Sequence, residues 1–138
     1  MRKWQVAIDT GGTFTDCIAV TPSAEILRLK VLSSAVLRVK ITYVLTNNTL
    51  RLDWPVQSTR SYLEGFTIRI GKKKYSIVTH DHKENTIVTD GKVVARAGDI
   101  AEISTGEEVP VFAIRILTQT SPTETVPPCE LRLGSTKG

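Results

Sequence analysis

The sequence predicts an α+β fold that is mostly β, combining N-terminal antiparallel strands, a small β barrel or sandwich and one amphipathic helix. Three observations predict it. Apolar runs flank a glycine-rich turn in residues 6–20, short alternating segments recur over 35–103, and the apolar period becomes helical over 104–120. We expect two units, the first made of residues 1–34 and 104–138 and the second of the intervening β module 35–103.

The composition is that of a globular protein with one or two small domains. Of the 138 residues, 41% are hydrophobic and 23% are charged, as is usual for such proteins. The sequence has neither an apolar run of the roughly 20 residues that span a bilayer nor the apolar core of a signal peptide. We therefore expect a cytoplasmic protein with no membrane partner. A net charge of +4 and an aromatic content of 6% give little support to a nucleic-acid partner.

The glycine-rich turn at residues 8–16, Ile-Asp-Thr-Gly-Gly-Thr-Phe-Thr-Asp, has the groups that bind an anion. Its adjacent glycines can adopt backbone angles closed to other residues, and successive N–H groups that face one concavity bind phosphate. Threonine hydroxyls add donors, and an aspartate at the strand end can hold a hydrated Mg²⁺. The predicted nucleotide contacts are Asp9, Gly11, Gly12, Thr13 and Thr15. A plain hairpin with a Gly-Gly turn is the structural alternative, and Asp16 is expected to cap backbone N–H groups of the loop.

This string resembles known phosphate loops. Asp-x-Gly-Gly-Thr-x-Thr-Asp after an N-terminal strand is similar to the first phosphate loop of the sugar kinase/Hsp70/actin superfamily, and the fuller string of residues 8–16 resembles the opening of the hydantoinase A/5-oxoprolinase family. The resemblance implies that the first strands are the ribonuclease-H-like start of an actin-like ATPase lobe. Residues 129–138 resemble the front of a second family motif. We expect the resemblance to cover 4–34 and 104–138, and the module 35–103 to be an insert.

The resemblance implies ATP-dependent opening of a cyclic amide, such as 5-oxoproline or a hydantoin, with ATP and Mg²⁺ as cofactors. Asp9 would place the metal and serve catalysis, while the glycines and threonines of the turn would hold phosphate. Family members are several times longer and close two lobes over the nucleotide. The sequence therefore predicts an N-terminal fragment that is inactive alone and needs the remainder of the chain or a partner subunit. Strands left unpaired by truncation allow a homodimer. The substrate contacts are not identified.

The module 35–103 is predicted to be all β. Short strands at this spacing are typical of a small barrel or sandwich. We expect strands at 37–45, 50–54, 66–70, 75–79, 86–89, 92–95 and 100–103, with a hairpin at Asp90-Gly91. One face of the first should carry Leu37, Val39, Ile41, Tyr43 and Leu45. A second functional hypothesis follows, in which the chain is a non-catalytic binding protein that uses this module.

Residues 104–120 predict an amphipathic helix. Val109, Phe112, Ala113, Ile116 and Leu117 follow helical spacing. Thr105 and Glu108 have the spacing of a capping box, and Pro110 places the start of the helix near itself. By resemblance, this is the helix expected soon after Ser34, displaced by the module.

Four smaller features each allow a functional and a structural interpretation. His80 and His82 fall on one face of a strand, but a closed zinc site has about four ligands, so we interpret 80–85 as a solvated hairpin tip. Lys72–Lys74 is interpreted as a solvated turn or an edge-strand guard rather than a phosphate contact. Trp4 and Trp54 are expected to pack rather than to stack on bases. Cys17 and Cys129 are too few for a disulfide framework, and Cys17 is expected to be a small buried residue rather than a nucleophile.

Overall fold

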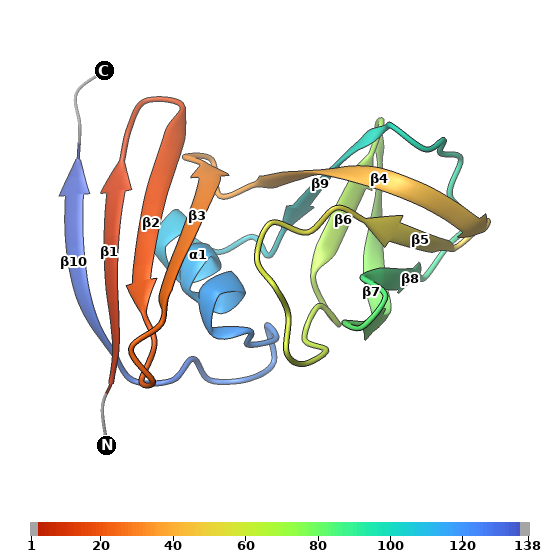
Figure 1. Cartoon of the computed structure of the whole chain (residues 1–138). Coiled ribbons are helices and arrows are strands. Elements are labelled where there is room, and N and C mark those ends of the chain that lie inside the picture. The colour runs from red at the N-terminus through yellow and green to blue at the C-terminus, as the bar shows by residue number, and fades with distance from the viewer. Residues whose placement is uncertain (1–2, 136–138) are drawn as a thin grey trace.

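The computed structural model describes residues 3–135 and contains an open sheet, a closed barrel and one helix (Figure 1). The predicted fold class, α+β and mostly β, is confirmed. The strands are β1 Trp4–Thr10, β2 Phe14–Val20, β3 Ile26–Leu32, β4 Leu37–Thr46, β5 Thr49–Leu52, β6 Thr67–Ile70, β7 Lys73–Asp81, β8 Thr86–Thr89, β9 Ile100–Ser104 and β10 Cys129–Ser135, and the helix is α1 Val109–Thr118. Within residues 3–135, no helix is long and apolar enough to cross a membrane.

The open sheet has the strand order β10-β1-β2-β3. Strands β1, β2 and β3 pair antiparallel, as predicted, whereas β10 returns from the far end of the chain and pairs parallel to β1. Alternation along the strands separates two faces. The inner face is apolar, with buried side chains such as Ile8, Ala19 and Val31, and α1 packs against it over β2 and β3. The outer face carries Asp9, Asp16 and other exposed residues.

The module forms a closed six-stranded barrel in the order β4-β5-β8-β7-β6-β9. Its interior is filled by apolar side chains that are almost fully buried, among them Ile41, Leu50, Ile68, Ile87 and Ile103. The single apolar face predicted for β4 is wrong beyond Ile41. A register shift between Ile41 and Tyr43 turns the following residues over, so that Tyr43 is 57% and Leu45 44% exposed.

The hairpin predicted at Asp90-Gly91 is wrong, because residues 92–95 form no strand. Strand β8 already has β5 on one side and β7 on the other, so it offers no open edge to a further strand. The chain instead crosses the barrel end to reach β9. On the way, the Thr89 hydroxyl donates to the Gly91 carbonyl at 2.7 Å, and the Val93 N–H donates to the Asn47 carbonyl at 2.6 Å.

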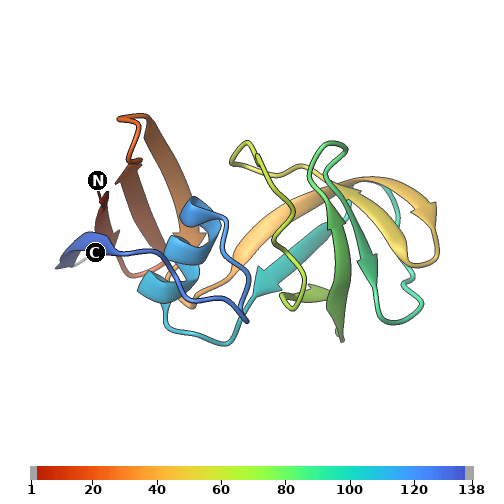
Figure 2. The same ribbon diagram turned by 90° about the horizontal axis from the view of Figure 1, so that it is seen from below.

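The helix α1 lies between the sheet and the barrel (Figure 2). Its predicted apolar face is buried, and Phe112 contacts Phe66 of the barrel unit with ring centroids 6.4 Å apart. Pro110 occupies the first turn, as predicted. The predicted capping box is wrong, since the N-cap residue is Glu108, whose side chain makes no cap hydrogen bond. The Thr105 hydroxyl instead accepts the Glu107 N–H at 3.4 Å.

The interpretation of residues 80–85 as a solvated tip is wrong for His80, which is 7% exposed. Its Nδ1 accepts the N–H groups of Tyr62 at 3.0 Å and Leu63 at 3.3 Å. Burial, with a smaller contribution from His82, lowers the pKa of His80 to about 4. His80 therefore anchors the loop 53–66 that covers the barrel end, and the described part of the chain holds no group of three or more potential metal ligands.

The other small features have structural positions. All three lysines are exposed; Lys72 lies in the turn between β6 and β7, whereas Lys73 and Lys74 begin β7. Trp54 is buried and its indole N–H donates to the Tyr62 hydroxyl at 3.0 Å. Cys17 is buried on the inner face of β2, and burial raises the pKa of its thiol to about 12, so it is unsuited to nucleophilic chemistry.

Candidate functional site

The glycine-rich turn is the short loop between β1 and β2, at residues 11–13. The Gly11 N–H donates to the Phe14 carbonyl at 2.9 Å and closes the loop. A Cβ on Gly11 would lie 2.9 Å from the same oxygen, so only glycine fits there. Neither Gly11 nor Gly12 has a positive φ. Unusual backbone angles, which the sequence suggested, therefore do not explain the glycines. The close approach to Phe14 explains Gly11, whereas a Cβ at Gly12 would meet no atom within 4 Å.

Ser33, which follows β3, holds this loop in place. Its hydroxyl donates to the Gly11 carbonyl at 2.8 Å and is 2.8 Å from the Thr15 hydroxyl. Its N–H donates to the Thr13 carbonyl at 2.9 Å. Ser33 was not among the predicted site residues, because a serine in a Ser-Ser-Ala turn carries no local signal of a contact to a distant loop.

The loop offers donors on its outer side. Gly12 and Thr13 are exposed, and among the hydrogen bonds of the described residues their N–H groups have no protein acceptor. The Gly11 N–H is consumed inside the loop. Two adjacent N–H groups and the Thr13 hydroxyl can therefore meet an anion.

Thr15 lies on the opposite face of the sheet from the other predicted ligand contacts. It is fully buried on the inner face of the sheet, and its hydroxyl is engaged with Ser33. Because successive residues of a strand alternate between faces, Thr15 points away from Asp16 and Asp9. The structure corrects its expected role, since Thr15 supports the loop through Ser33.

Two carboxylates lie opposite each other beside the loop. Asp9 on β1 is paired with Asp16 on β2, and both are exposed on the outer face. Like charges directly opposite each other repel, and a cation shared between them relieves this repulsion. Lys30 on β3 is paired with Asp16 on its other side, with its Nζ 5.1 Å from the Phe14 ring centroid. Asp16 therefore belongs to the strand face, and its expected role as a cap of loop N–H groups is wrong.

The end of β10 lies at the same edge of the sheet as the loop (Figure 1). Gly134 is paired with Asp9, and a Cβ on Gly134 would lie 3.6 Å from an Asp9 carboxylate oxygen, so glycine leaves room beside this carboxylate. The segment 129–138, which resembles a second family motif, is described only to Ser135, and Thr136, Lys137 and Gly138 lie outside the described residues.

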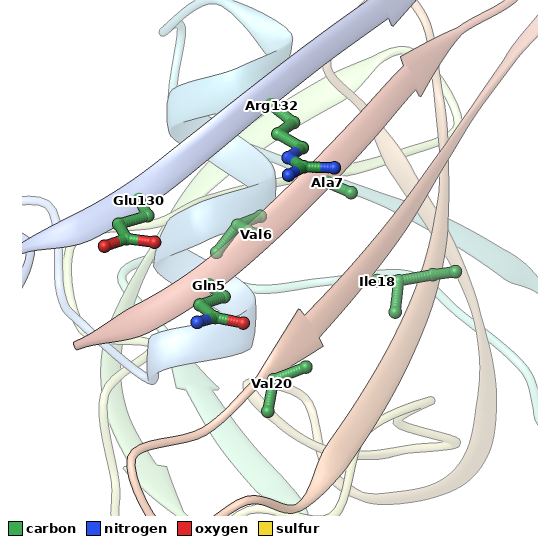
Figure 3. Close-up of a pocket in the computed structure, with 7 residues that line it drawn as sticks. All are labelled: Gln5, Val6, Ala7, Ile18, Val20, Glu130 and Arg132. Atoms are coloured by element: carbon green, nitrogen blue, oxygen red, sulfur yellow. The ribbon is translucent and has the colours of Figure 1, made fainter. Parts of the chain in front are cut away.

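A shallow hollow on the outer face continues from this position along β10, β1 and β2. Figure 3 shows Arg132 and Glu130 of β10 beside Gln5 and Ala7 of β1, with Ile18 of β2 opposite. Arg132 also borders a second hollow that includes both carboxylates. Arg132 reaches the site only through the parallel pairing of β10 with β1, and a pairing between distant segments leaves no local pattern from which it could be predicted.

These features define a class of protein, an α+β and mostly β chain with a glycine-threonine hairpin whose donors lie beside paired carboxylates. Residues 5–71 match the family model described as the hydantoinase/oxoprolinase N-terminal region. The resemblance inferred from the hairpin residues is thereby confirmed, and this part of the chain belongs to that family. No match was found among curated proteins or among solved structures.

The match corrects the expected extent of the resemblance. We expected it to end at residue 34, whereas it runs to residue 71 and includes β4, β5 and β6 of the barrel. The similarity of 104–138 to the family and the status of 35–103 as an insert stay predictions.

Proposed function

We propose that this hydantoinase/oxoprolinase N-terminal region binds the phosphates of Mg·ATP and contributes its hairpin to the ATP-dependent opening of a cyclic amide. One observation carries the proposal: the exposed N–H groups of Gly12 and Thr13 lie at the end of the strands that bear Asp9 and Asp16. Backbone donors bind the anion, and carboxylates beside them bind its counter-cation.

Asp9 is the proposed Mg²⁺ ligand, and Asp16, paired with it, is positioned to share the ion. Mg²⁺ usually binds one or two carboxylates and fills its remaining coordination positions with waters and phosphate oxygens. The carboxylates of Asp9 and Asp16 match this preference. When bound, the metal would neutralise phosphate charge. The loop residues Gly11, Gly12 and Thr13 would hold the phosphate, with Gly11 acting through the shape of the loop.

We further propose that the 138-residue chain has no hydrolase activity alone and acts in the cytoplasm. The described residues supply one glycine-rich hairpin site, whereas the resemblance implies phosphate loops from two lobes. The remainder of a hydantoinase/oxoprolinase chain, or a partner subunit, would supply the second. Turnover of ATP coupled to 5-oxoproline by this chain alone would contradict the proposed inactivity.

Backbone NMR during titration with Mg·ATP tests the binding proposal. We expect the amide signals of Gly12 and Thr13 to shift, and the shifts to weaken by about tenfold in apparent affinity in Asp9→Asn, because hydrogen bonds and contacts to charged groups contribute on this scale. Asp53→Asn is the matched control, since Asp53 is an exposed aspartate of the barrel unit. Unchanged loop amides at millimolar Mg·ATP would overturn the proposal.

The same titration tests the second candidate function, a non-catalytic binding module. A specific feature favours it, a hollow on the outer barrel wall that is lined by Arg38, Arg69 and Glu102. The Glu102 carboxylate lies 3.3 Å from the Arg38 guanidinium and 2.7 Å from that of Arg69. If an anionic ligand shifts amides of β4, β6 and β9 but not of the hairpin, the binding-module function is favoured over nucleotide binding.

A further inference from the structure

Strand β10 is an edge strand with an open outer side. It ends the strand order of the sheet, with β1 on one side, and no strand of the described residues 3–135 pairs on the other (Figure 1). Its hydrogen-bonding groups on that side form a template for another strand. Pro127 and Pro128 precede the strand and lack N–H groups, which confines a regular ladder to residues 129–135.

The apolar side chains of β10 are also not covered. Leu131 and Leu133 are paired with Val6 and Ile8, whose side chains are buried on the inner face. Because aligned residues of paired strands share a face, Leu131 and Leu133 point to the inner face as well. The helix α1 packs against β2 and β3, and Leu131 stays 43% and Leu133 64% exposed.

The charges of β10 select the partner. Glu130 and Arg132 flank Leu131 on the outer face, so the strand carries opposite charges on either side of one residue. In an antiparallel pair of two copies, residues directly opposite share a face. A two-fold axis at Leu131 places Glu130 of each copy opposite Arg132 of the other and the two Leu131 side chains opposite each other. Axes at Glu130 or Arg132 would instead face like charges, and a one-residue slip would mix the two faces.

We propose that two copies of this chain associate through β10, antiparallel and centred on Leu131, into one continuous sheet. The proposal is independent of nucleotide binding. A second copy is the proposed partner of β10 because Glu130 and Arg132 of the two copies complement each other. The pairing also gives Leu131 and Leu133 apolar neighbours, with Leu133 opposite Cys129 of the second copy. An interface of this small size is weak, and we expect a dissociation constant of roughly 10 µM to 1 mM.

Charge reversal tests the association. In sedimentation experiments from 10 µM to 1 mM, a range set by that estimate, wild-type protein should dimerise. E130R and R132E should each weaken dimerisation by about tenfold, because each creates two like-charge pairs per dimer. The double variant E130R/R132E should restore it. A monomeric wild type at 1 mM, or single reversals that dimerise as well as wild type, would overturn the proposal, and circular dichroism establishes that each variant is folded.

Cysteine cross-linking tests the register. Under mild oxidation, L131C in a C129S background should form a disulfide between copies, since directly opposite Cα atoms are about 4.5 to 5.5 Å apart. L133C should cross-link when Cys129 is present and should lose this cross-link in the C129S background. Cross-linking of L133C that does not depend on Cys129 would show another register and contradict the proposed axis.

Discussion

The Ser33 hydroxyl donates a 2.8 Å hydrogen bond to the carbonyl oxygen of Gly11, a residue 22 positions away in the chain. The Ser33 hydroxyl is also hydrogen-bonded to the buried Thr15 hydroxyl. The backbone N–H of Ser33 donates to the Thr13 carbonyl. The β1–β2 loop, β2 and the residue after β3 are thereby joined by one small group of hydrogen bonds. Ser33 therefore fixes the position of the loop that carries the Gly12 and Thr13 N–H groups, although Ser33 is not on the outer face.

We expect Ser33→Ala to destabilise the fold by about 1 to 2 kcal/mol, because it removes the partner of a buried hydroxyl as well as a bond to the Gly11 carbonyl. The amide signals of Gly12 and Thr13 should move or broaden in the absence of ligand. Urea unfolding and NMR measure the two effects. Ser34→Ala is the matched control and should stay within about 0.5 kcal/mol of wild type; equal effects at both serines would contradict the assigned role.

The two glycines should respond differently to substitution by alanine. Gly11→Ala places a Cβ 2.9 Å from the Phe14 carbonyl oxygen, and relief of this contact requires a backbone shift costing about 1 to 3 kcal/mol. Gly12→Ala meets no atom within 4 Å and should leave stability within about 0.5 kcal/mol. Because neither glycine has a positive φ, the comparison isolates steric contact. Denaturant unfolding measures it, and equal losses would refute this explanation.

The sequence predicted the elements whose signal is local. The hairpin, β3, most barrel strands and the buried face of α1 each follow from an apolar period within one segment. The predictions failed where a β-bulge or a distant segment determines which way a side chain points or whether a segment forms a strand. A register shift between Ile77 and Thr79 in β7 turns His80 inward, and the polar string around it gave no sign of this.

The candidate site divides in the same way. Asp9, Gly12 and Thr13 lie in one short string, so a motif could identify them. Ser33 and Arg132 reach the site only through pairings with distant strands. The burial of Thr15 follows from the strand alternation, which sequence reasoning about hydroxyl donors did not apply.

Arg115 of α1 should be more sensitive to substitution than an arginine in an exposed ion pair. It is 8% exposed, pairs with Glu107 at 2.7 Å, and donates to the carbonyls of Ser121 and Glu124 at 2.7 Å and 2.9 Å. We expect Arg115→Met to lower the free energy of unfolding by about 3 kcal/mol, because the Glu107 carboxylate and the two carbonyl groups would lose their hydrogen-bond partner. Arg60→Met, which removes an exposed pair with Glu124, should cost under about 1 kcal/mol. Thermal unfolding distinguishes these outcomes, and similar losses for both arginines would contradict the argument.

The stability of the fold should decrease in mild acid because of His80. The folded state lowers the pKa of His80 from 6.5 to about 4, so only the unfolded state binds this proton between those values. Stability is therefore fully present above pH 6.5, falls as the pH decreases toward 4, and loses nothing more from this group below it. The total loss is on the order of 3 kcal/mol.

The comparison of His80→Gln with wild type isolates this contribution. The glutamine side-chain oxygen can accept the Tyr62 N–H but does not titrate, so the variant should lose the part of the pH dependence that lies between neutral pH and pH 4.5. Glu107, whose pKa is lowered by its hydrogen bond to Arg115, loses its contribution at lower pH in both proteins and cancels in the difference. His82→Gln is the matched control and should change the profile only slightly, because His82 hydrogen-bonds with Ser61 and makes only the smaller contribution to the lowered pKa of His80. Urea unfolding at pH 7 and pH 4.5 measures the difference, and a difference between wild type and His80→Gln that does not change with pH would exclude His80 as its source.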